Sequence, residues 1–197
     1  DLYFFAYGND FRAAMKAFID LTGQTALPAK DLFGIIFSRW PCFDDAEART
    51  LVQRFETEGI PLSMLMLDLE WHIPDFSHWD WDRQQFPDPQ AFLDWAHARQ
   101  LLIGLNVHPQ YLFSSDSHLE AYAQAADVAD KVQPLYENPM AALLVKSGAD
   151  KMLTTDLANP AEAQAIKSIC CEPLLKQGVD FWWVDGASSA LNGADGQ

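Results

Sequence analysis

The sequence predicts an α/β fold, a (β/α)8 TIM barrel of which this chain supplies about the first four β/α units. Apolar runs of strand length alternate four times with stretches of helical periodicity, which implies a parallel sheet with helical crossovers. Polar and aromatic residues then follow each apolar run, at the strand end where barrels carry their active sites. A doubly wound sheet has the same alternation, but no glycine-rich phosphate-binding sequence follows any predicted strand.

The first predicted element is a helix over residues 9–22, whose apolar side chains recur at helical spacing and which stops at Gly23. A linker over residues 24–30 follows. Residues 32–40 are then an almost continuous apolar run, typical of a strand buried on both faces. We predict the first barrel strand there.

The second helix has a clear start and end. Asp44 stands three residues ahead of Glu47, a spacing typical of a capping box, and Gly59 ends the helical pattern. Residues 60–69 are a second apolar run, rich in Leu and Met, in which polarity arrives only at the C-terminal end. This run is the predicted second strand.

A third unit begins at Asp88-Pro89, a typical N-cap and first-turn pair. The helix that it starts is followed by a third predicted strand over residues 101–107. Residues 114–152 give no consistent pattern beyond an alanine-rich helix near 119–128. We leave that segment unplaced.

The fourth unit opens on Asn159 as cap and Pro160 as first helical residue. The predicted helix runs to Gly178 despite the interior Pro173. Residues 179–185 are the fourth predicted strand.

Chain length limits the barrel, because eight β/α units need roughly 250 residues and this chain has 197. We therefore expect a truncated barrel. Residues 31–197 form its first half, and residues 1–30 form a separate leading segment with the linking helix.

Charge excludes some partners. The chain has 28 acidic and 13 basic residues, a formal charge of −15, which opposes binding to nucleic acid or to an anionic membrane surface. No stretch approaches a membrane span, and no signal peptide is present in this chain. Localisation stays unknown, either cytoplasmic or secreted, and a neutral ligand fits best.

The three cysteines do not match a disulfide framework or a metal motif. We interpret Cys42, Cys170 and Cys171 as small buried apolar residues.

The predicted strand ends supply the candidate site residues. Asp185 follows an aromatic wall, where restricted solvent favours a nucleophilic carboxylate, although an Asp before Gly is also a common turn residue. Asp68 could accept hydrogen bonds from sugar hydroxyls while Trp71 stacks on a ring, or it could cap or brace a loop. His108 ends the third strand.

Asp68 and Asp185 do not form the catalytic pair of a retaining glycosidase, whose carboxyl groups lie about 5 to 5.5 Å apart. They belong to the second and fourth strands, so we take Asp68 as a substrate-binding residue. Arg39 and Trp40 could shape a subsite, or Arg39 could be a salt-bridged rim residue.

A metal site is the less favoured alternative, with His72, His108, Asp68 and Asp185 as ligands. No His-x-His pair supports it. The patch over residues 79–82 is better interpreted as loop packing. The remaining histidines, to which we assign no role, are His78, His97 and His118.

Taken together, the ordered motifs resemble glycoside hydrolase family 31. They are Leu2 to Asp10, Leu67-Asp68-Leu-Glu-Trp71-His72, Phe86-Pro87-Asp88, Asn106-Val-His108-Pro109, Asp156-Leu-Ala-Asn159-Pro160 and Phe181-Trp-Trp-Val-Asp185. The resemblance spans nearly the whole chain and is weakest over residues 112–151.

The resemblance implies a retaining α-glycosidase that acts on α-glucosides, α-xylosides or related α-linked sugars, on a barrel preceded by a β-sandwich and without metal or cofactor. Residues 1–30 would include the exit from that sandwich. Asp185 would be the catalytic nucleophile, and the acid/base would come from a later loop, after Gln197. The substrate-binding residues would be Asp68, Trp71, His108, Trp183, Arg39 and Trp40.

Two departures from the family pattern leave the sugar and linkage open. Many members continue the nucleophile motif as Asp-Met-Asn-Glu, whereas Gly-Ala-Ser-Ser follows Asp185, and many have Trp where Asn106 stands. The alternative function is a catalytically inactive carbohydrate-binding or structural barrel fragment. We expect the isolated chain to be inactive, and a homo-oligomer through the full-length protein is compatible with the sequence.

Overall fold

The computed structural model describes residues 2–40 and 43–185. The chain divides into two units, Asp1–Phe33 and Gly34–Gln197. Among the described residues, no helix is long and apolar enough to cross a bilayer.

The first unit contains helix α1 (Phe11–Thr22), capped by the Asp10 carboxylate, which accepts a hydrogen bond from the Ala13 amide. A short 3-10 turn, η1 (Lys30–Phe33), ends the unit. Residues 2–33 contain no strand. A β-sandwich before residue 30 therefore stays a prediction.

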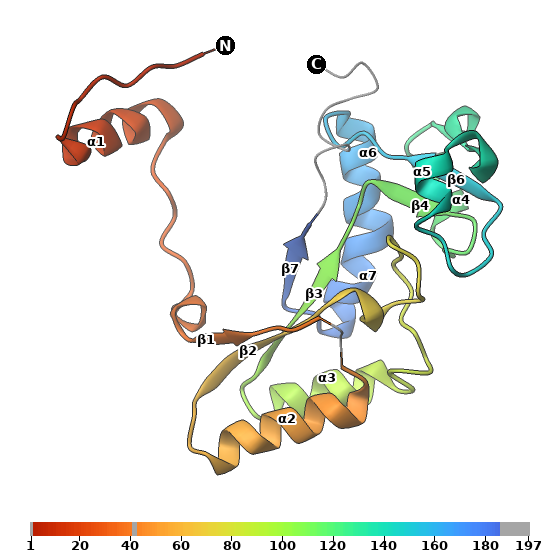
Figure 1. Ribbon diagram of the computed structural model, residues 1–197, viewed down its shortest axis with the longest axis horizontal. Coiled ribbons are helices and arrows are strands. Elements are labelled where there is room, and N and C mark those ends of the chain that lie inside the picture. The colour runs from red at the N-terminus through yellow and green to blue at the C-terminus, as the bar shows by residue number, and fades with distance from the viewer. Residues whose placement is uncertain (1, 41–42, 186–197) are drawn as a thin grey trace. The chain divides into compact units, whose positions relative to one another are not determined.

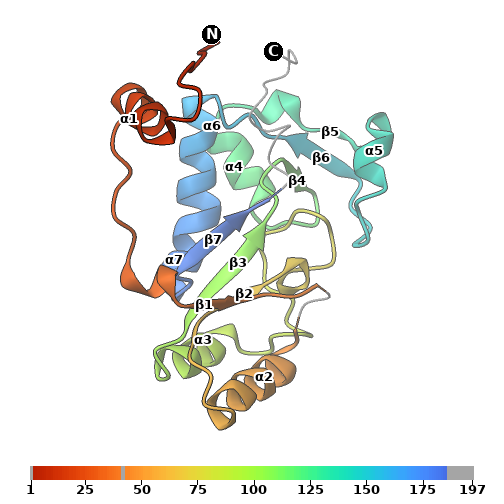
Figure 2. The same cartoon turned by 60° about the vertical axis from the view of Figure 1, so that its left-hand side comes forward.

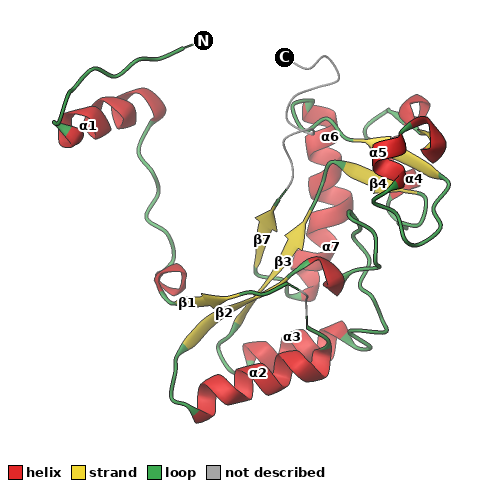
Figure 3. Ribbon diagram, viewed as in Figure 1, coloured by secondary structure: helices red, strands yellow, loops and turns green. Residues whose placement is uncertain are grey.

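The second unit is built on a four-stranded sheet in the order β1-β2-β3-β7, in which all neighbours are parallel (Figures 1 and 3). The strands are β1 (Ile35–Phe37), β2 (Leu62–Leu67), β3 (Leu102–Val107) and β7 (Phe181–Val184). Chain order and spatial order coincide, as expected for consecutive strands of a barrel wall. The predicted fold class is confirmed.

The crossover helices begin where the sequence predicts. They are α2 (Asp45–Thr57), α3 (Pro89–His97) and α6 (Pro160–Ala165). Their caps are Asp44, Asp88 and Asn159, each of which accepts a backbone N–H of the first turn. Figure 2 shows α2 and α3 together on one side of the sheet, with the helix from α6 to α7 running along β3 and β7.

Strand β1 is much shorter than the predicted run of residues 32–40. Residues 30–33 instead form η1, in which the Leu32 amide donates to the carbonyl of Ala29. The pairing with β2 is also irregular between Ile35 and Ile36. Only three residues therefore join the ladder.

The predicted helix over residues 159–178 is interrupted. Between α6 and α7 (Glu172–Gln177) lies a π-helical segment, η5 (Ile166–Cys171). A proline has no N–H and clashes with the carbonyl four residues earlier, so Pro173 cannot continue a regular ladder. The wider turn of η5 accommodates it, and Gly178 ends the helix in a left-handed conformation (φ 119°).

The segment that the sequence leaves unplaced forms a second, antiparallel sheet in the order β4-β6-β5. Its strands are β4 (Tyr111–Phe113), β5 (Gln133–Pro134) and β6 (Lys151–Thr154), and its helices are α4 (Leu119–Ala125) and α5 (Pro139–Ala142). The short turns η3 (Ala129–Lys131) and η4 (Leu135–Glu137) connect them. A small core of Phe113, Leu135, Ala141 and Met152 holds this excursion together.

The two faces of the parallel sheet differ. Leu105 and Val107 alternate along β3 on the face that packs against the helices, within the main core. The opposite face carries Gly104 and Asn106. A Cβ atom on Gly104 would overlap ring atoms of Phe181, so only glycine lets β7 lie this close to β3.

Candidate active site

Strand register gathers the predicted polar residues at one edge of the sheet. Leu67 pairs with Leu105, so Asp68 and Asn106 are the next residues along their strands. In the same way Val107 pairs with Val184, and the Asp185 amide donates to the Val107 carbonyl (3.0 Å). His108 and Asp185 therefore follow side by side, at the carboxyl ends of β3 and β7.

Asp68 is half-buried, and its Oδ1 accepts two hydrogen bonds. One comes from the Leu69 amide (2.7 Å), which starts the turn η2 (Leu69–Trp71), and the other from Asn106 Nδ2 (3.1 Å). Asp68 therefore does brace the loop after β2. Neither bond uses Oδ2, which leaves one carboxylate oxygen for a ligand.

His108 lies within the electrostatic influence of both Asp68 and Asp185. The residue is 5% exposed, and its ring packs against Phe76 with centroids 4.1 Å apart. Burial lowers the pKa of His108, and this effect outweighs the nearby charges of Asp185 and Asp68, which favour the protonated form. The imidazole is therefore neutral at neutral pH and can exchange hydrogen bonds with hydroxyl groups.

Asp185 is exposed, whereas His108, which lies beside it after β3, is buried. The side chains of Trp183 and Asp185 point to the same face, since they lie two residues apart on one strand. Trp183 is 55% exposed, so its ring can offer a flat apolar surface beside the carboxylate. This is the combination of groups that a sugar site needs.

Trp71 lies in a different environment from the one expected. It has no exposed surface, its indole Nε1 donates to the Asn106 carbonyl (2.8 Å), and it packs edge-on against Trp81. The expectation that its ring stacks on a sugar is not supported, because no ring face is open. η2 turns the side chain into the core, where it holds the end of β3.

Arg39 and Trp40 follow β1, and two strands, β2 and β3, separate β1 from β7 in the sheet. The Arg39 guanidinium bonds Glu47 (3.1 Å) and lies 4.1 Å from the centre of the Phe43 ring. These contacts favour the rim salt bridge over a subsite. Trp40 is 69% exposed.

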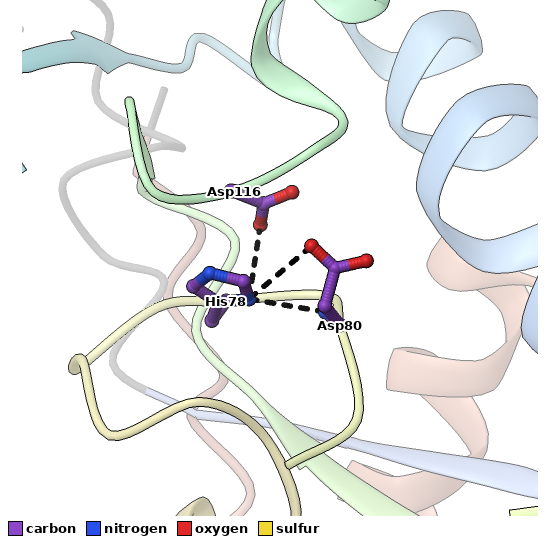
Figure 4. Close-up of side chains that lie close together, drawn as sticks. All are labelled: His78, Asp80 and Asp116. Carbon is purple, nitrogen blue, oxygen red and sulfur yellow. Dashed lines mark hydrogen bonds and ion pairs between the residues drawn. The ribbon is translucent and has the colours of Figure 1, made fainter. Parts of the chain in front are cut away.

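A second polar cluster, not predicted as a site, joins the loop after β2 to the segment after β4. His78 Nδ1 lies 3.7 Å from Asp116 Oδ2 and 3.8 Å from Asp80 Oδ2 (Figure 4). His118 Nδ1 bonds Asp116 Oδ1 at 2.7 Å. We call these four residues the His–Asp cluster. Its only signal in the sequence is a pair of mirrored motifs, His78-x-Asp80 and Asp116-x-His118.

The carboxylates of the His–Asp cluster are well satisfied. Asp116 also accepts from the backbone amides of Trp79 and His118, and Asp80 accepts from Ser117. Burial opposes ionisation of Asp116, but the His118 hydrogen bonds and the charge of His78 outweigh it, so its pKa is lowered. Burial also opposes protonation of His118, yet Asp116 raises its pKa.

The alternative metal set of His72, His108, Asp68 and Asp185 does not come together as ligands. Within residues 2–40 and 43–185, the one group of three potential ligands with close donor atoms is His78, Asp80 and Asp116. His72 lies elsewhere in the core, where burial lowers its pKa to about 4.

The other sequence interpretations concern packing. Trp79 and Trp81 are buried, which confirms loop packing for their patch. Cys170 is a buried free thiol whose pKa is raised by burial, and Cys171 is half-buried. Cys42 lies outside the described residues. His97, to which the sequence assigns no role, contacts Asp180 Oδ2 through Nε2 (2.9 Å) just before β7.

Comparison with known proteins extends these observations. Human neutral alpha-glucosidase AB is 29% identical over 103 residues, 52% of this chain and 11% of that protein. Alpha-xylosidase XylQ of Lactiplantibacillus pentosus is 26% identical over 122 residues, 60% of this chain and 16% of that protein. This chain thus spans about a tenth to a sixth of the length of these relatives.

Solved structures share the fold. The Flavobacterium johnsoniae GH31 dextranase complexed with isomaltotriose superposes with a TM-score of 0.68 at 19% identity, over 90% of this chain and 21% of that one. The Xanthomonas citri GH31 alpha-xylosidase gives a TM-score of 0.62 at 18% identity, over 87% and 18% of the two chains. Residues 25–196 match the model of the glycosyl hydrolases family 31 TIM-barrel domain. The chain belongs to glycoside hydrolase family 31.

Proposed function

We propose that this chain carries the nucleophile of a retaining α-glycosidase that cleaves α-linked glucosides or related sugars, with Asp185 as the attacking carboxylate. The observation that supports it most is the register of β3 and β7, which sets Asp185 beside His108. Asp68 lies at the end of the neighbouring strand, braced by Asn106. Carboxylates at the carboxyl ends of barrel strands stand where barrel enzymes carry out their chemistry.

The reaction has two displacements at the anomeric carbon. Asp185 attacks that carbon as the bond to the leaving oxygen breaks, and a second carboxylic acid gives its proton to that oxygen. A covalent glycosyl ester on Asp185 results. Water, deprotonated by the second carboxylate, then attacks the same carbon, which releases the sugar and restores both groups.

The second carboxyl group is not Asp68. One strand separates Asp68 from Asp185, and the Asp68 Oδ1 atom is already committed to Leu69 and Asn106. Asp68 instead binds sugar hydroxyls through Oδ2, with His108 as a second polar partner and Trp183 as an apolar surface. Structural neighbours include a dextranase complexed with isomaltotriose and an alpha-xylosidase complexed with xylose, which supports a glucose-like or xylose-like ring as the substrate.

The isolated 197-residue chain is expected to hydrolyse no α-glycoside. Within residues 2–40 and 43–185, β1 and β7 are the outer strands of the parallel sheet, each with one unpaired side. Among the described residues, none is assigned the proton-donor role. The proposed activity therefore belongs to the whole protein.

Trapping of the glycosyl ester tests the proposal. The protein is incubated with a 5-fluoro-α-glucosyl fluoride, whose leaving group needs no proton donor, and digested for mass spectrometry. We expect one glycosyl adduct on the peptide that contains Asp185, and none in Asp185→Asn. The exposed Asp130 serves as a control, since Asp130→Asn should be labelled like the wild type. Sugar binding without an adduct or turnover in the wild type would instead favour the non-catalytic alternative.

A further inference from the structure

The face of β3 that lies opposite the helices, which we call the inner face, carries the amide of Asn106, to which the proposed mechanism assigns no contact with the sugar. Asn106 is 6% exposed, and its Nδ2 donates to Asp68 Oδ1 (3.1 Å). An ionised carboxylate only accepts hydrogen bonds, so it fixes which end of the amide faces it. Asn106 Oδ1 is therefore turned away from Asp68.

Asn106 Oδ1 is a buried acceptor with no hydrogen-bond partner among the described residues. Leaving such a group unpaired costs roughly 1–3 kcal/mol. Other residues at this level of the inner face, such as Gly104 and Phe181, present no side-chain polar group. The Asn106 amide therefore destabilises the folded protein at this position unless a hydrogen-bond donor pairs with its Oδ1.

The position of the amide is also fixed from behind. The Trp71 indole donates to the Asn106 carbonyl (2.8 Å), which holds the backbone, while Asp68 holds the side chain. The Asp68 carboxylate is in turn held by the Leu69 amide. These bonds hold Asn106 and Asp68 in place before a ligand arrives, and they leave Asn106 Oδ1 and Asp68 Oδ2 as two unused acceptors at the ends of neighbouring strands.

We propose that Asn106 determines the sugar specificity of the site by accepting a hydrogen bond from one ring hydroxyl while Asp68 Oδ2 accepts from another. This inference rests on the proposed function and deepens it. The substrate class is a pyranoside with two free hydroxyls that reach both acceptors. Sugars in which either hydroxyl is missing or methylated are bound poorly, because a buried acceptor then stays unpaired.

The test measures binding without turnover. In the Asp185→Asn protein, calorimetry compares methyl α-D-glucopyranoside with its 2-, 3-, 4- and 6-deoxy analogues, with and without Asn106→Leu. We expect Asn106→Leu to weaken binding of the parent glycoside roughly tenfold. For one deoxy analogue, which already lacks the relevant hydroxyl, the same substitution should change the affinity less than about twofold.

The pattern separates recognition from a structural role. A loss of equal size for the parent and all deoxy analogues would mean that Asn106 only supports Asp68, and would overturn the inference. The inference would also be overturned if Asn106→Leu left the affinity for every sugar unchanged, or if the Asp185→Asn protein with Asn106 intact bound none of the sugars. Thermal melting checks folding, and Asn106→Ala replaces Asn106→Leu if the larger side chain does not fit. Asn9→Leu, in the first unit, is the control.

The proposed function fails by a different result. Hydrolysis by the Asp185→Asn protein at the wild-type rate would exclude Asp185 as the nucleophile, whatever the effect of Asn106→Leu on binding. If the Asp185→Asn protein is inactive and Asn106→Leu weakens binding of all the sugars equally, Asp185 remains the nucleophile. Only the specificity role of Asn106 is then excluded.

Discussion

Two polar clusters in the second unit are both rich in Asp and His and differ in how their atoms are paired. The strand-end site comprises Asp68, Asn106, His108 and Asp185, and the His–Asp cluster comprises His78, Asp80, Asp116 and His118. In the His–Asp cluster, both oxygens of Asp80 and of Asp116 accept hydrogen bonds, although His78 Nε2 is buried without a partner among the described residues. In the strand-end site, Asn106 Oδ1 and His108 Nδ1 are buried and have no partner among the described residues.

We infer from the unused Asp68 Oδ2 that the strand-end site binds a ligand, and from the fully paired carboxylates that the His–Asp cluster holds two loops together. Folding strongly disfavours a buried polar atom without a partner, so such atoms persist where a ligand or another part of the protein supplies one. A cluster whose carboxylate oxygens are all paired gains from being rigid. The His–Asp cluster ties the loop after β2 to the segment after β4 through contacts between residues 37 or 38 positions apart in the chain.

The largest expected effect concerns activity at the strand-end site. Asp185→Asn should lower kcat at least about a thousandfold, because the amide is a far weaker nucleophile than the carboxylate. The urea midpoint should change little, since the side chain is exposed. Steady-state kinetics with an aryl α-glucoside and equilibrium unfolding measure the two quantities. A large fall in stability would place Asp185 with the structural residues and break the comparison.

The opposite behaviour is expected at the His–Asp cluster. Asp116→Asn removes a buried charge and leaves an amide N–H facing either the Trp79 amide or His118. We expect a loss of about 2–3 kcal/mol in the free energy of unfolding, with kcat retained in the folded protein. Asp130→Asn should stay within about 0.5 kcal/mol of the wild type. Loss of kcat at full stability would show that this cluster takes part in the reaction.

A third substitution tests whether the strand-end site depends on strand spacing. The added methyl of Gly104→Ala must push the Phe181 ring away, and β7 carries Asp185. We expect a cost of about 1–3 kcal/mol in stability together with a lower kcat. Adding Phe181→Leu should recover part of both. Gly59→Ala, at a glycine that no neighbour approaches but that has φ +68°, should cost stability without lowering kcat.

The sequence predicts the parallel sheet well because its signals are local. Asp44, Asp88 and Asn159 cap their helices as expected, since a cap depends only on the next three residues. The strand ends that bear Asp68 and Asp185 follow from the same apolar runs. Their register with Asn106 and His108 emerges only from the folded sheet.

The rest could not be predicted because it depends on distant contacts. Strand β5 has two residues and pairs with β6 about 18 positions later, so no periodicity reveals it. His78 and Asp116 come into contact only when the loop after β2 packs against the segment after β4. Trp71 looked like a sugar platform beside Asp68, but η2 turns its ring into the core.

The smallest expected effect is a pH dependence that sharpens the role of the His–Asp cluster. The folded-state pKa of His118 is raised by Asp116 and Asp80, so its contribution to stability is complete below its unfolded pKa of about 6.5. This contribution is lost as the pH rises through the folded value. The lowered pKa of Asp116 acts in the opposite sense: its contribution is lost as the pH falls below about 4. The ion pair is therefore strongest between these limits.

His118→Gln isolates the upper limit. The free energy of unfolding, measured in urea from pH 5 to pH 9, should differ between wild type and variant by about 1 kcal/mol at pH 5 and by less at pH 9. Burial lowers the pKa of His72 to about 4. His72 therefore makes the folded state more stable as the pH rises towards 6.5, which is the opposite of the trend expected for His118. Because both proteins keep His72, its effect cancels in the difference. A difference that is constant with pH would mean that the His118–Asp116 contact is a neutral hydrogen bond, and the His–Asp cluster would then be held by geometry rather than by charge.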